Sequence, residues 1–217
     1  SPEEASNAMN QPRVLFLGCG ALAREVTAIL ELNQGLDIEV EYLPASLHNR
    51  PERISDELRR RLALHASKYD RILLGYGDCG TGGEIDAVCD EYQIERLPGS
   101  HCYEFYLPPG RFEDLHAENP ATFYLTDYLA KHFDRLVFQV LGIDLHPELL
   151  DLYFGNYERV LYLAQVAEPE LLAAAHYAAD RLGLPLVIEA TGYGQLADSL
   201  EIAGPSPMSP ASLPASK

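Results

Sequence analysis

The chain is poor in basic residues. It has 16 Lys and Arg against 33 Asp and Glu, which gives a formal net charge of −17. Nucleic acids and anionic membrane surfaces attract proteins that present a basic surface. We therefore expect neither as a partner, and the ordinary consequence of the charge is solubility.

Long apolar segments are missing as well. No apolar run approaches the roughly 20 residues that a helix needs to cross a bilayer, and no charged-then-apolar secretory signal stands at the start. With 47% hydrophobic and 23% charged residues, the 217 residues have the composition of a globular protein of one large or two small domains. We expect it to be cytoplasmic.

Several short motifs with known chemistry are absent from the sequence. There is no CxxC pair, no HxxxH or HxH pair, and no Lys-Ser/Thr after the glycine-rich segment. These absences argue against a zinc ribbon and a P-loop. The four cysteines of a cytosolic chain then indicate metal binding or thiol chemistry rather than a disulfide framework.

What is present is a glycine-rich segment, residues 75–84, that follows an apolar run and precedes a helical pattern. Its five glycines in nine positions allow positive φ angles and bring backbone N–H groups close to a ligand. Packing explains Cys79 in the middle of this loop poorly, because free cysteines are usually buried as small hydrophobes. Cys19 and Cys102 also follow apolar segments and adjoin glycines, so we expect these three loops to meet.

Strand-like and helix-like patterns alternate along the chain. Strands are predicted at 13–18, 38–43, 71–76, 94–97, 136–141, 160–163 and 186–189. Helices are predicted at 21–33, 51–67, 84–92, 120–129, 147–154, 168–182 and 194–202. The alternation predicts an α/β fold with a Rossmann-like parallel sheet, in two similar halves with a cleft between them.

The same patterns divide the chain into five parts. Residues 13–107 form the first α/β half with the cysteine and glycine loops, and 134–203 form the second half. The aromatic-rich segment 108–133 connects them, either as a lid over a site or as elements packed on a sheet. Residues 1–12 are expected to be a tag or disordered, and 204–217 a disordered tail rich in Pro, Ser and Ala.

Several of these segments carry a family resemblance. They are the Gly18-Cys19-Gly20 loop with Glu25, the Tyr76–Gly80 segment, the Cys102 loop, residues 123–126 and residues 153–157. Over about residues 13–200 the chain resembles the domain of unknown function 1638 family. His101 departs from the family pattern, which has an acidic residue there. The resemblance implies no established activity, and it suggests methyl-group or corrinoid chemistry only through the association of some relatives with corrinoid-dependent methyl-transfer proteins.

The three cysteines suit a thiolate site at the carboxyl ends of parallel strands, where ligands bind. Cys19, Cys79 and Cys102 would hold zinc with Zn–S bonds near 2.3 Å, and His101 or Glu25 would serve as a fourth ligand or base. The alternatives are thiol–disulfide chemistry, cysteines that only pack, and an Fe–S cluster on the same cysteines. The fourth cysteine, Cys89, is expected in the core.

The glycine-rich loop has two interpretations. As an anion cradle, Gly77, Gly80, Gly82 and Gly83 would aim backbone donors at a phosphate or carboxylate, with Tyr76 lining the site. The alternative is a tight turn between a strand and a helix. The sequence does not decide between them.

Taken together, these patterns predict a zinc thiolate protein that binds a small anionic or thiol ligand. It would act as a metal-dependent transferase of methyl or sulfur groups, because a metal holds a substrate thiol as the nucleophilic thiolate. The competing hypothesis is a non-catalytic accessory protein that serves a corrinoid or metal-delivery partner, with a corrinoid as the bound cofactor. A homo-oligomer remains open.

Overall fold

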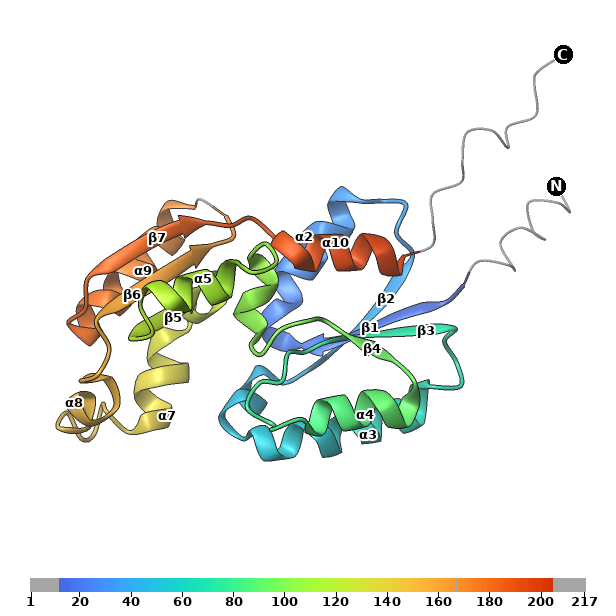
Figure 1. The fold of residues 1–217 in the computed structure, drawn as a ribbon, viewed down its shortest axis with the longest axis horizontal. Helices are drawn as coiled ribbons and strands as arrows, with labels where there is room; N and C mark the ends of the chain where they lie inside the picture. Colours follow the sequence, from blue (N-terminus) through green and yellow to red (C-terminus); the bar gives the residue numbers. More distant parts are fainter. Residues whose placement is uncertain (1–11, 167, 205–217) are drawn as a thin grey trace, which may run out of the picture.

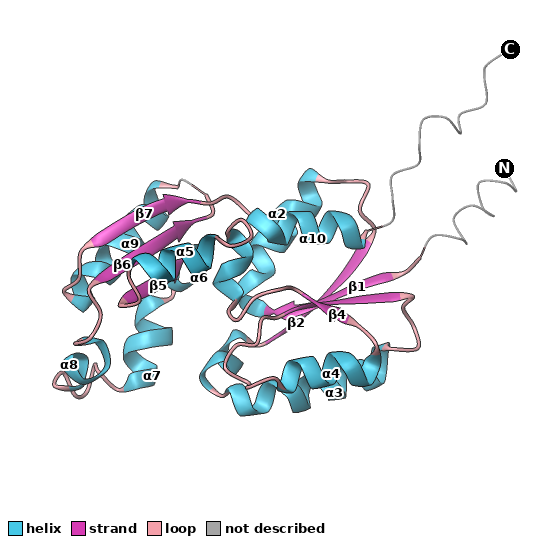
Figure 2. Cartoon of the chain, viewed as in Figure 1, coloured by secondary structure: helices cyan, strands magenta, loops and turns pink. Residues whose placement is uncertain are grey.

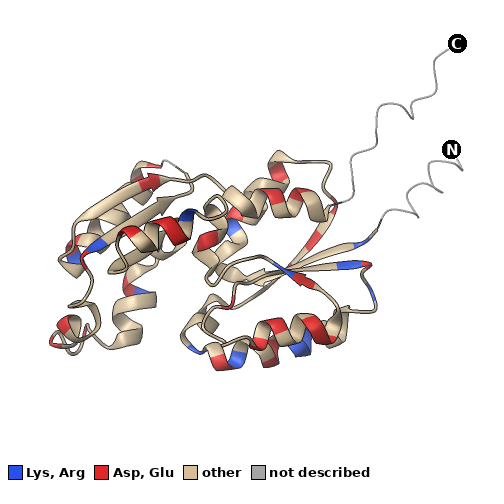
Figure 3. Cartoon of the chain, viewed as in Figure 1, with Lys and Arg blue, Asp and Glu red and all other residues tan. Residues whose placement is uncertain are grey.

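The computed structural model describes residues 12–166 and 168–204. The predicted tag at 1–12 and tail at 204–217 lie outside these residues, apart from residues 12 and 204. Within the described ranges no helix is long and apolar enough to cross a membrane. Acidic side chains are spread over the helices of both halves (Figure 3).

The first half is built on a four-stranded parallel sheet with the order β2-β1-β3-β4 (Figure 1). The strands are β1 (Val14–Cys19), β2 (Ile38–Leu43), β3 (Arg71–Gly75) and β4 (Glu95–Arg96). All six residues of β1 are buried, as expected of a central strand covered on both faces.

Helices cover both faces of this sheet (Figure 2). On one face lie η1 (Gly20–Leu22), α2 (Ala23–Leu32) and α10 (Gly194–Ala203). On the other lie η3 (Pro51–Arg53), α3 (Ile54–His65) and α4 (Glu84–Tyr92), and the short η2 (Ala45–Asn49) follows β2. Successive residues of β1 supply the two cores, because side chains alternate across a strand.

The second half has a three-stranded parallel sheet with the order β5-β6-β7. The strands are β5 (Thr122–Thr126), β6 (Arg159–Ala164) and β7 (Leu186–Ala190). α6 (Asp127–Lys131) and α9 (Pro169–Leu182) pack on one face, and α5 (Arg111–Glu118) packs on the other. The remaining elements are η4 (Cys102–Tyr106), the π-helical turn η5 (Asp134–Phe138), α7 (Gln139–Leu141) and α8 (Leu149–Phe154).

The α/β fold with parallel sheets is confirmed, and two predicted elements are wrong. Residues 120–129 were expected as a helix, but Thr122–Thr126 is the first strand of the second sheet. Residues 136–141 were expected as a strand, but they lie in η5 and α7. Both are short apolar runs, which have no periodicity that separates a buried strand from a buried helix.

The two halves meet at the carboxyl ends of their strands. α6, which directly follows β5, contacts η1, which directly follows β1. Arg24 on α2 donates to Glu168 at 2.7 Å, and Gln195 on α10 donates to the carbonyl of Leu107 at 2.9 Å. Loops from both sheets therefore share one junction, where ligands of α/β proteins usually bind.

Candidate thiol site and the adjoining carboxylates

Three cysteines come together at the carboxyl edge of the first sheet. Cys19 ends β1, Cys79 lies in the loop after β3, and Cys102 begins η4 after β4. The Sγ atoms of Cys79 and Cys102 are 3.2 Å apart. The Cys19 thiol is close enough for the charge of Cys79 to raise its pKa, after the larger effect of burial. The structure thus brings together the three loops that the sequence singled out.

Backbone contacts hold the Cys79 and Cys102 loops against each other. The N–H of Cys79 donates to the carbonyl of Ser100 at 2.8 Å. A Cβ atom on Gly77 would lie 2.9 Å from the backbone nitrogen of His101 and 3.0 Å from the carbonyl oxygen of Gly99. Because these neighbours are backbone atoms, only glycine permits this approach without moving one of the loops.

Cys79 has a left-handed backbone. Its φ is +50°, and Gln93 is the only other non-glycine residue with positive φ in the described part of the chain. Such a conformation costs on the order of 1 kcal/mol or more for a residue with a side chain. The contacts between the two loops keep Cys79 in this conformation and its thiol beside Cys102.

The two neighbouring thiols differ in acidity. The hydrogen bond with Cys102 lowers the pKa of Cys79, and the backbone N–H of Gly77 and the charge of His101 lower it further. The same hydrogen bond, with burial, holds the pKa of Cys102 well above its usual range. Burial raises the pKa of Cys19 to about 11. The pair therefore ionises first at Cys79, and Cys102 keeps its proton as the donor.

Tyr76 places an unsatisfied hydroxyl beside these thiols. The residue is 2% exposed, and its hydroxyl has no hydrogen-bond partner of good geometry among the described residues. It nevertheless lies close enough to Cys19 to lower the pKa of that thiol. Burial raises the pKa of Tyr76, so it stays a phenol. An unpaired buried O–H costs about 1–3 kcal/mol, which an acceptor at the site would recover.

The spacing of the sulfur atoms bears on the predicted zinc. Two thiolates on one tetrahedral zinc lie about 3.8 Å apart, given Zn–S bonds near 2.3 Å. In residues 12–166 and 168–204, no group of three or more His, Cys, Asp or Glu side chains is arranged to hold a metal ion. The thiols of Cys79 and Cys102, now 3.2 Å apart, would have to separate by about 0.6 Å to share zinc, and the metal stays a prediction.

His101 is held by its own segment. Its Nδ1 atom lies 3.2 Å from Oε1 of Glu104, which also accepts the backbone N–H of His101 at 3.0 Å. The His101 ring stacks on Tyr103 at 4.8 Å, and Tyr103 stacks on Tyr124 at the same distance. These rings pack between η4 and the second sheet. The role of His101 as fourth ligand or base remains untested.

The glycine-rich loop contains an anion of its own. Gly80, Gly82 and Gly83 have positive φ angles. The N–H groups of Gly82 and Gly83 donate to the carboxylate of Asp78 at 3.3 and 2.7 Å, which lowers the pKa of Asp78. An external anion would have to compete with Asp78 for these donors. The cradle role predicted for Tyr76, Gly77 and these three glycines is not tested.

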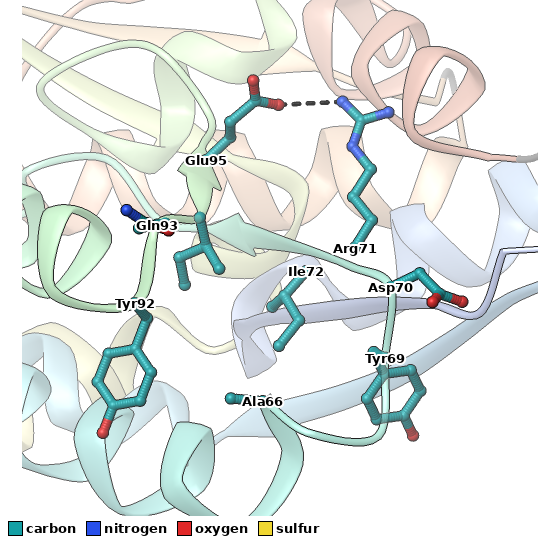
Figure 4. A pocket seen from close by; sticks show the side chains of 9 residues that line it. Ala66, Tyr69, Asp70, Arg71, Ile72, Tyr92, Gln93 and Glu95 are labelled. Atoms are coloured by element: carbon teal, nitrogen blue, oxygen red, sulfur yellow. Dashed lines mark hydrogen bonds and ion pairs between the residues drawn. The ribbon is translucent and has the colours of Figure 1, made fainter.

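A hollow of about 380 Å³ lies at the amino-terminal edge of the first sheet, where β3 begins (Figure 4). Its lining includes Tyr69, Arg71, Tyr92 and Glu95. Arg71 is already paired with Glu95 at 3.0 Å. Because Arg71 is paired with Glu95 and the thiols of Cys19, Cys79 and Cys102 lie at the other edge, we place no function in this hollow.

Two buried carboxylates adjoin the thiols at the junction of the halves. Glu25 on α2 is 2% exposed, and Asp127 at the start of α6 is 1% exposed. Burial raises the pKa of Glu25, and the charge of Asp127 raises it further. Burial raises the pKa of Tyr106, and the charges of Glu25, Cys102 and Cys19 raise it further.

Sequence reasoning singled out Glu25 and missed Asp127. Asp127 directly follows β5, so it occupies the edge position at which functional side chains are expected. The predicted helix at 120–129 concealed that position. The signal in the sequence was Asn119, whose side-chain oxygen accepts the N–H of Ala121 in a turn that precedes a strand.

Comparisons with known proteins give a family and no activity. The profile of a family described as "Protein of unknown function (DUF1638)" matches residues 42–200, well over half of the chain. This range contains Cys79, Cys102 and Asp127, and it begins after Cys19 and Glu25. A search of the curated proteins found no match.

Proposed function

The chain belongs to the DUF1638 family of proteins of unknown function, and we propose from its own geometry that it binds a thiophilic metal ion, zinc in the first instance. The observation that carries the proposal is the 3.2 Å contact between the Sγ atoms of Cys79 and Cys102. Two thiols from separate loops, held together by backbone contacts at the carboxyl edge of a parallel sheet, suit a shared soft cation.

The acidity of the pair supports this proposal. Metal ligands must be deprotonated, and Cys79 is the thiol whose pKa is lowered, by its hydrogen bond with Cys102. The same bond raises the pKa of Cys102, so binding has to displace the proton between the two sulfurs. Metal uptake should therefore release protons, which gives the proposal a readout besides metal content.

Cys19 is the proposed third ligand. The charge of Cys79 acts on the Cys19 thiol, and Cys19 in turn acts on Cys102. Burial raises the pKa of Cys19 to about 11, so a bound cation would be needed to hold it as the thiolate at neutral pH. Three thiolates leave one coordination position open for a small thiol or anionic ligand. A metal there would hold a ligand thiol as thiolate for methyl or sulfur transfer, the activity proposed for this enzyme.

A second candidate function, thiol–disulfide exchange, draws on the same contact. The sulfur separation of 3.2 Å is shorter than that of a zinc-bound pair. In this case the Cys79 thiolate would attack an external disulfide and release one thiolate, and Cys102 would then attack the Cys79 sulfur of the mixed disulfide, forming a Cys79–Cys102 disulfide and releasing the second thiolate. A non-catalytic accessory role, an Fe–S cluster or a corrinoid on the same residues are outcomes that the experiment below also distinguishes.

The test compares the metal content of the protein with that of matched variants. Reduced protein is reconstituted with zinc, desalted and analysed for metals, together with Cys79→Ser, Cys102→Ser and the control Cys89→Ala. Cys89 is buried on α4 and belongs to the core. We expect about one equivalent of zinc in the unmodified chain and the control, with proton release, and a loss in the two site variants.

Less than about a tenth of an equivalent of any transition metal in the unmodified chain would refute the metal site. Visible absorbance after anaerobic purification would indicate an Fe–S cluster or a corrinoid instead. If metals are absent and mild oxidation removes two hydrogens at Cys79 and Cys102, the exchange function replaces the proposal. A full equivalent of zinc, with no spectroscopic change of the protein when thiols or anions are added, would favour the accessory role.

A further inference from the structure

The outer edge of the second sheet carries apolar side chains that the helices leave uncovered. β7 runs along the outer rim of the second half (Figure 1). All but the first residue of its neighbour β6 are buried, whereas no residue of β7 is buried. Val187 is 42% exposed and Ile188 is 46% exposed. Because successive side chains of a strand point to opposite faces, β7 exposes apolar groups on both faces of a sheet that helices normally cover.

The backbone of β7 has a free row of hydrogen-bonding groups along the same edge. Within residues 12–166 and 168–204, β6 is the only strand that pairs with β7. The carbonyl of Pro185 accepts an N–H of β6 and the N–H of Thr191 donates to a carbonyl of β6, both at 2.9 Å. Backbone groups of successive strand residues point to opposite edges, so the odd-numbered residues of β7 face β6. The outward-facing N–H and C=O groups are those of Leu186, Ile188 and Ala190.

The other three sheet edges are protected against pairing with another chain. β4 has only two residues, and β2 carries Glu39 and Glu41 in ion pairs. β5 packs against η4, and three of its five residues are buried. Short strands, charges and covering segments are the usual devices that keep a sheet edge from pairing. β7 has five residues without lysine or proline, and its one charge, Glu189, is held by Arg111 through both carboxylate oxygens at 3.0 Å.

The sequence of β7 is complementary to a second copy of itself. A two-fold axis, the commonest symmetry of dimers, joins identical edge strands in antiparallel orientation. With the axis at Ile188, each Ile188 faces the other and Leu186 faces Ala190, so the outward-facing residues form hydrogen-bonded pairs that exchange both N–H···O bonds. Glu189 faces Val187 of the other copy rather than a second carboxylate. No like charges therefore oppose each other across the pair.

We propose that two copies of this chain associate through β7, which joins their three-stranded sheets into one continuous sheet. Pairing satisfies the outward backbone groups and covers Val187 and Ile188. Stable interfaces bury about 1,600 Å² in total, and a five-residue strand with its flanking side chains buries less. We therefore expect a reversible dimer with a dissociation constant of about 10–100 µM.

Sedimentation equilibrium at chain concentrations from about 5 to 500 µM, a range that brackets this constant, tests the interface. Each chain has a formal net charge of −17, so the measurement is made at about 0.15 M salt to screen the repulsion between copies. We expect a monomer–dimer equilibrium with no larger species, because pairing uses the free edge of each copy.

Two substitutions at Ile188 make the test specific. Ile188→Lys sets two positive charges against each other at the axis, and Ile188→Pro removes an outward N–H that makes no bond to β6. Each should weaken dimerisation at least about tenfold. Val40→Lys is the matched control, because Val40 is 41% exposed on β2, an edge strand of the other sheet. This variant should dimerise like the unmodified chain.

The proposal is wrong if the chain stays monomeric throughout, if larger assemblies form, or if Ile188→Lys dimerises as tightly as the unmodified chain. Thermal unfolding at the lowest concentration, where the monomer predominates, shows which variants are folded, and either folded Ile188 variant decides the question. Ile188 lies in the half that holds no cysteine, so its variants should keep the zinc content of the unmodified chain. The interface and the metal site can therefore fail independently.

Discussion

Replacing Gly77 by alanine tests how the two thiols are held together. The added Cβ atom would lie 2.9 Å from the backbone nitrogen of His101 and 3.0 Å from both the carbonyl oxygen of Gly99 and the carbonyl carbon of Ser100. Real Cβ contacts at these distances force a shift, and here every neighbour is backbone. The Cys79 and Cys102 loops must therefore move apart by a few tenths of an ångström.

The expected cost of Gly77→Ala is about 1–3 kcal/mol in the free energy of unfolding, the range for overpacking a tightly packed site. Urea unfolding measures this value. The second expected effect is a lower affinity for a trivalent arsenical, a reagent that needs two neighbouring thiols to bind. Zinc needs the two sulfurs about 3.8 Å apart, wider than the 3.2 Å in this structure, so a small separation should not by itself weaken zinc binding.

Gly82→Ala in the same loop is the matched control. Gly82 has φ +66°, and a Cβ atom there would meet nothing within 4 Å. Its cost is therefore only that of a left-handed alanine, about 1 kcal/mol, and thiol binding should not change. The reasoning fails if Gly77→Ala unfolds like the unmodified chain and keeps its arsenical affinity, or if the two variants behave alike.

Three further predictions concern single groups at the site. Iodoacetamide at neutral pH should modify Cys79 before Cys102, because the hydrogen bond between the two thiols lowers the pKa of Cys79 and raises the pKa of Cys102. Peptide mass mapping measures the order of modification, and the reverse order would contradict this prediction. Tyr76→Phe removes a hydroxyl that has no hydrogen-bond partner among the described residues, so the free energy of unfolding should stay level or rise by up to about 1 kcal/mol. A loss above about 2 kcal/mol would mean that the Tyr76 hydroxyl makes a stabilising hydrogen bond, which would contradict this prediction. Burial raises the pKa of Glu25 in the folded chain above its ordinary 4.5, so Glu25 destabilises the fold increasingly as the pH rises above that value. Glu25→Gln should thus stabilise the chain more at about pH 7 than at about pH 4 in ligand-free urea titrations, and an equal effect at both would refute the shift.

The first half could be predicted well because its signals are local. Buried runs that end at glycine gave β1 and β3, and the rule that loops meet at the carboxyl edge of a parallel sheet brought their cysteines together. The contact that sets Cys79 beside Cys102 could not be predicted in the same way. It depends on Gly77 packing against backbone some 20 residues later, which no sequence period reports.

The junction of the halves was harder to predict because its residues come from distant segments. Residues 120–129 were predicted as a helix, so the position of Asp127 just after strand β5 was missed. Arg24 donates to Glu168, which is 144 residues away in sequence, and no local pattern reports that contact. Glu25 was visible only as an acidic residue on the first helix. Its burial and its unpaired Oε2 atom are properties of the packed molecule, which no sequence pattern reports.

The short helix η4 links the thiols to the carboxylates. Cys102 begins it and Tyr106 ends it, so a movement of η4 would displace a sulfur of the thiol pair and the Tyr106 ring together. A Cβ atom on Gly194, at the start of α10, would collide with the backbone of Tyr106. Gly194 belongs to the segment that returns from the second sheet to the first. The close approach of Gly194 therefore ties the position of η4, and with it Cys102, to the segment that joins the two halves.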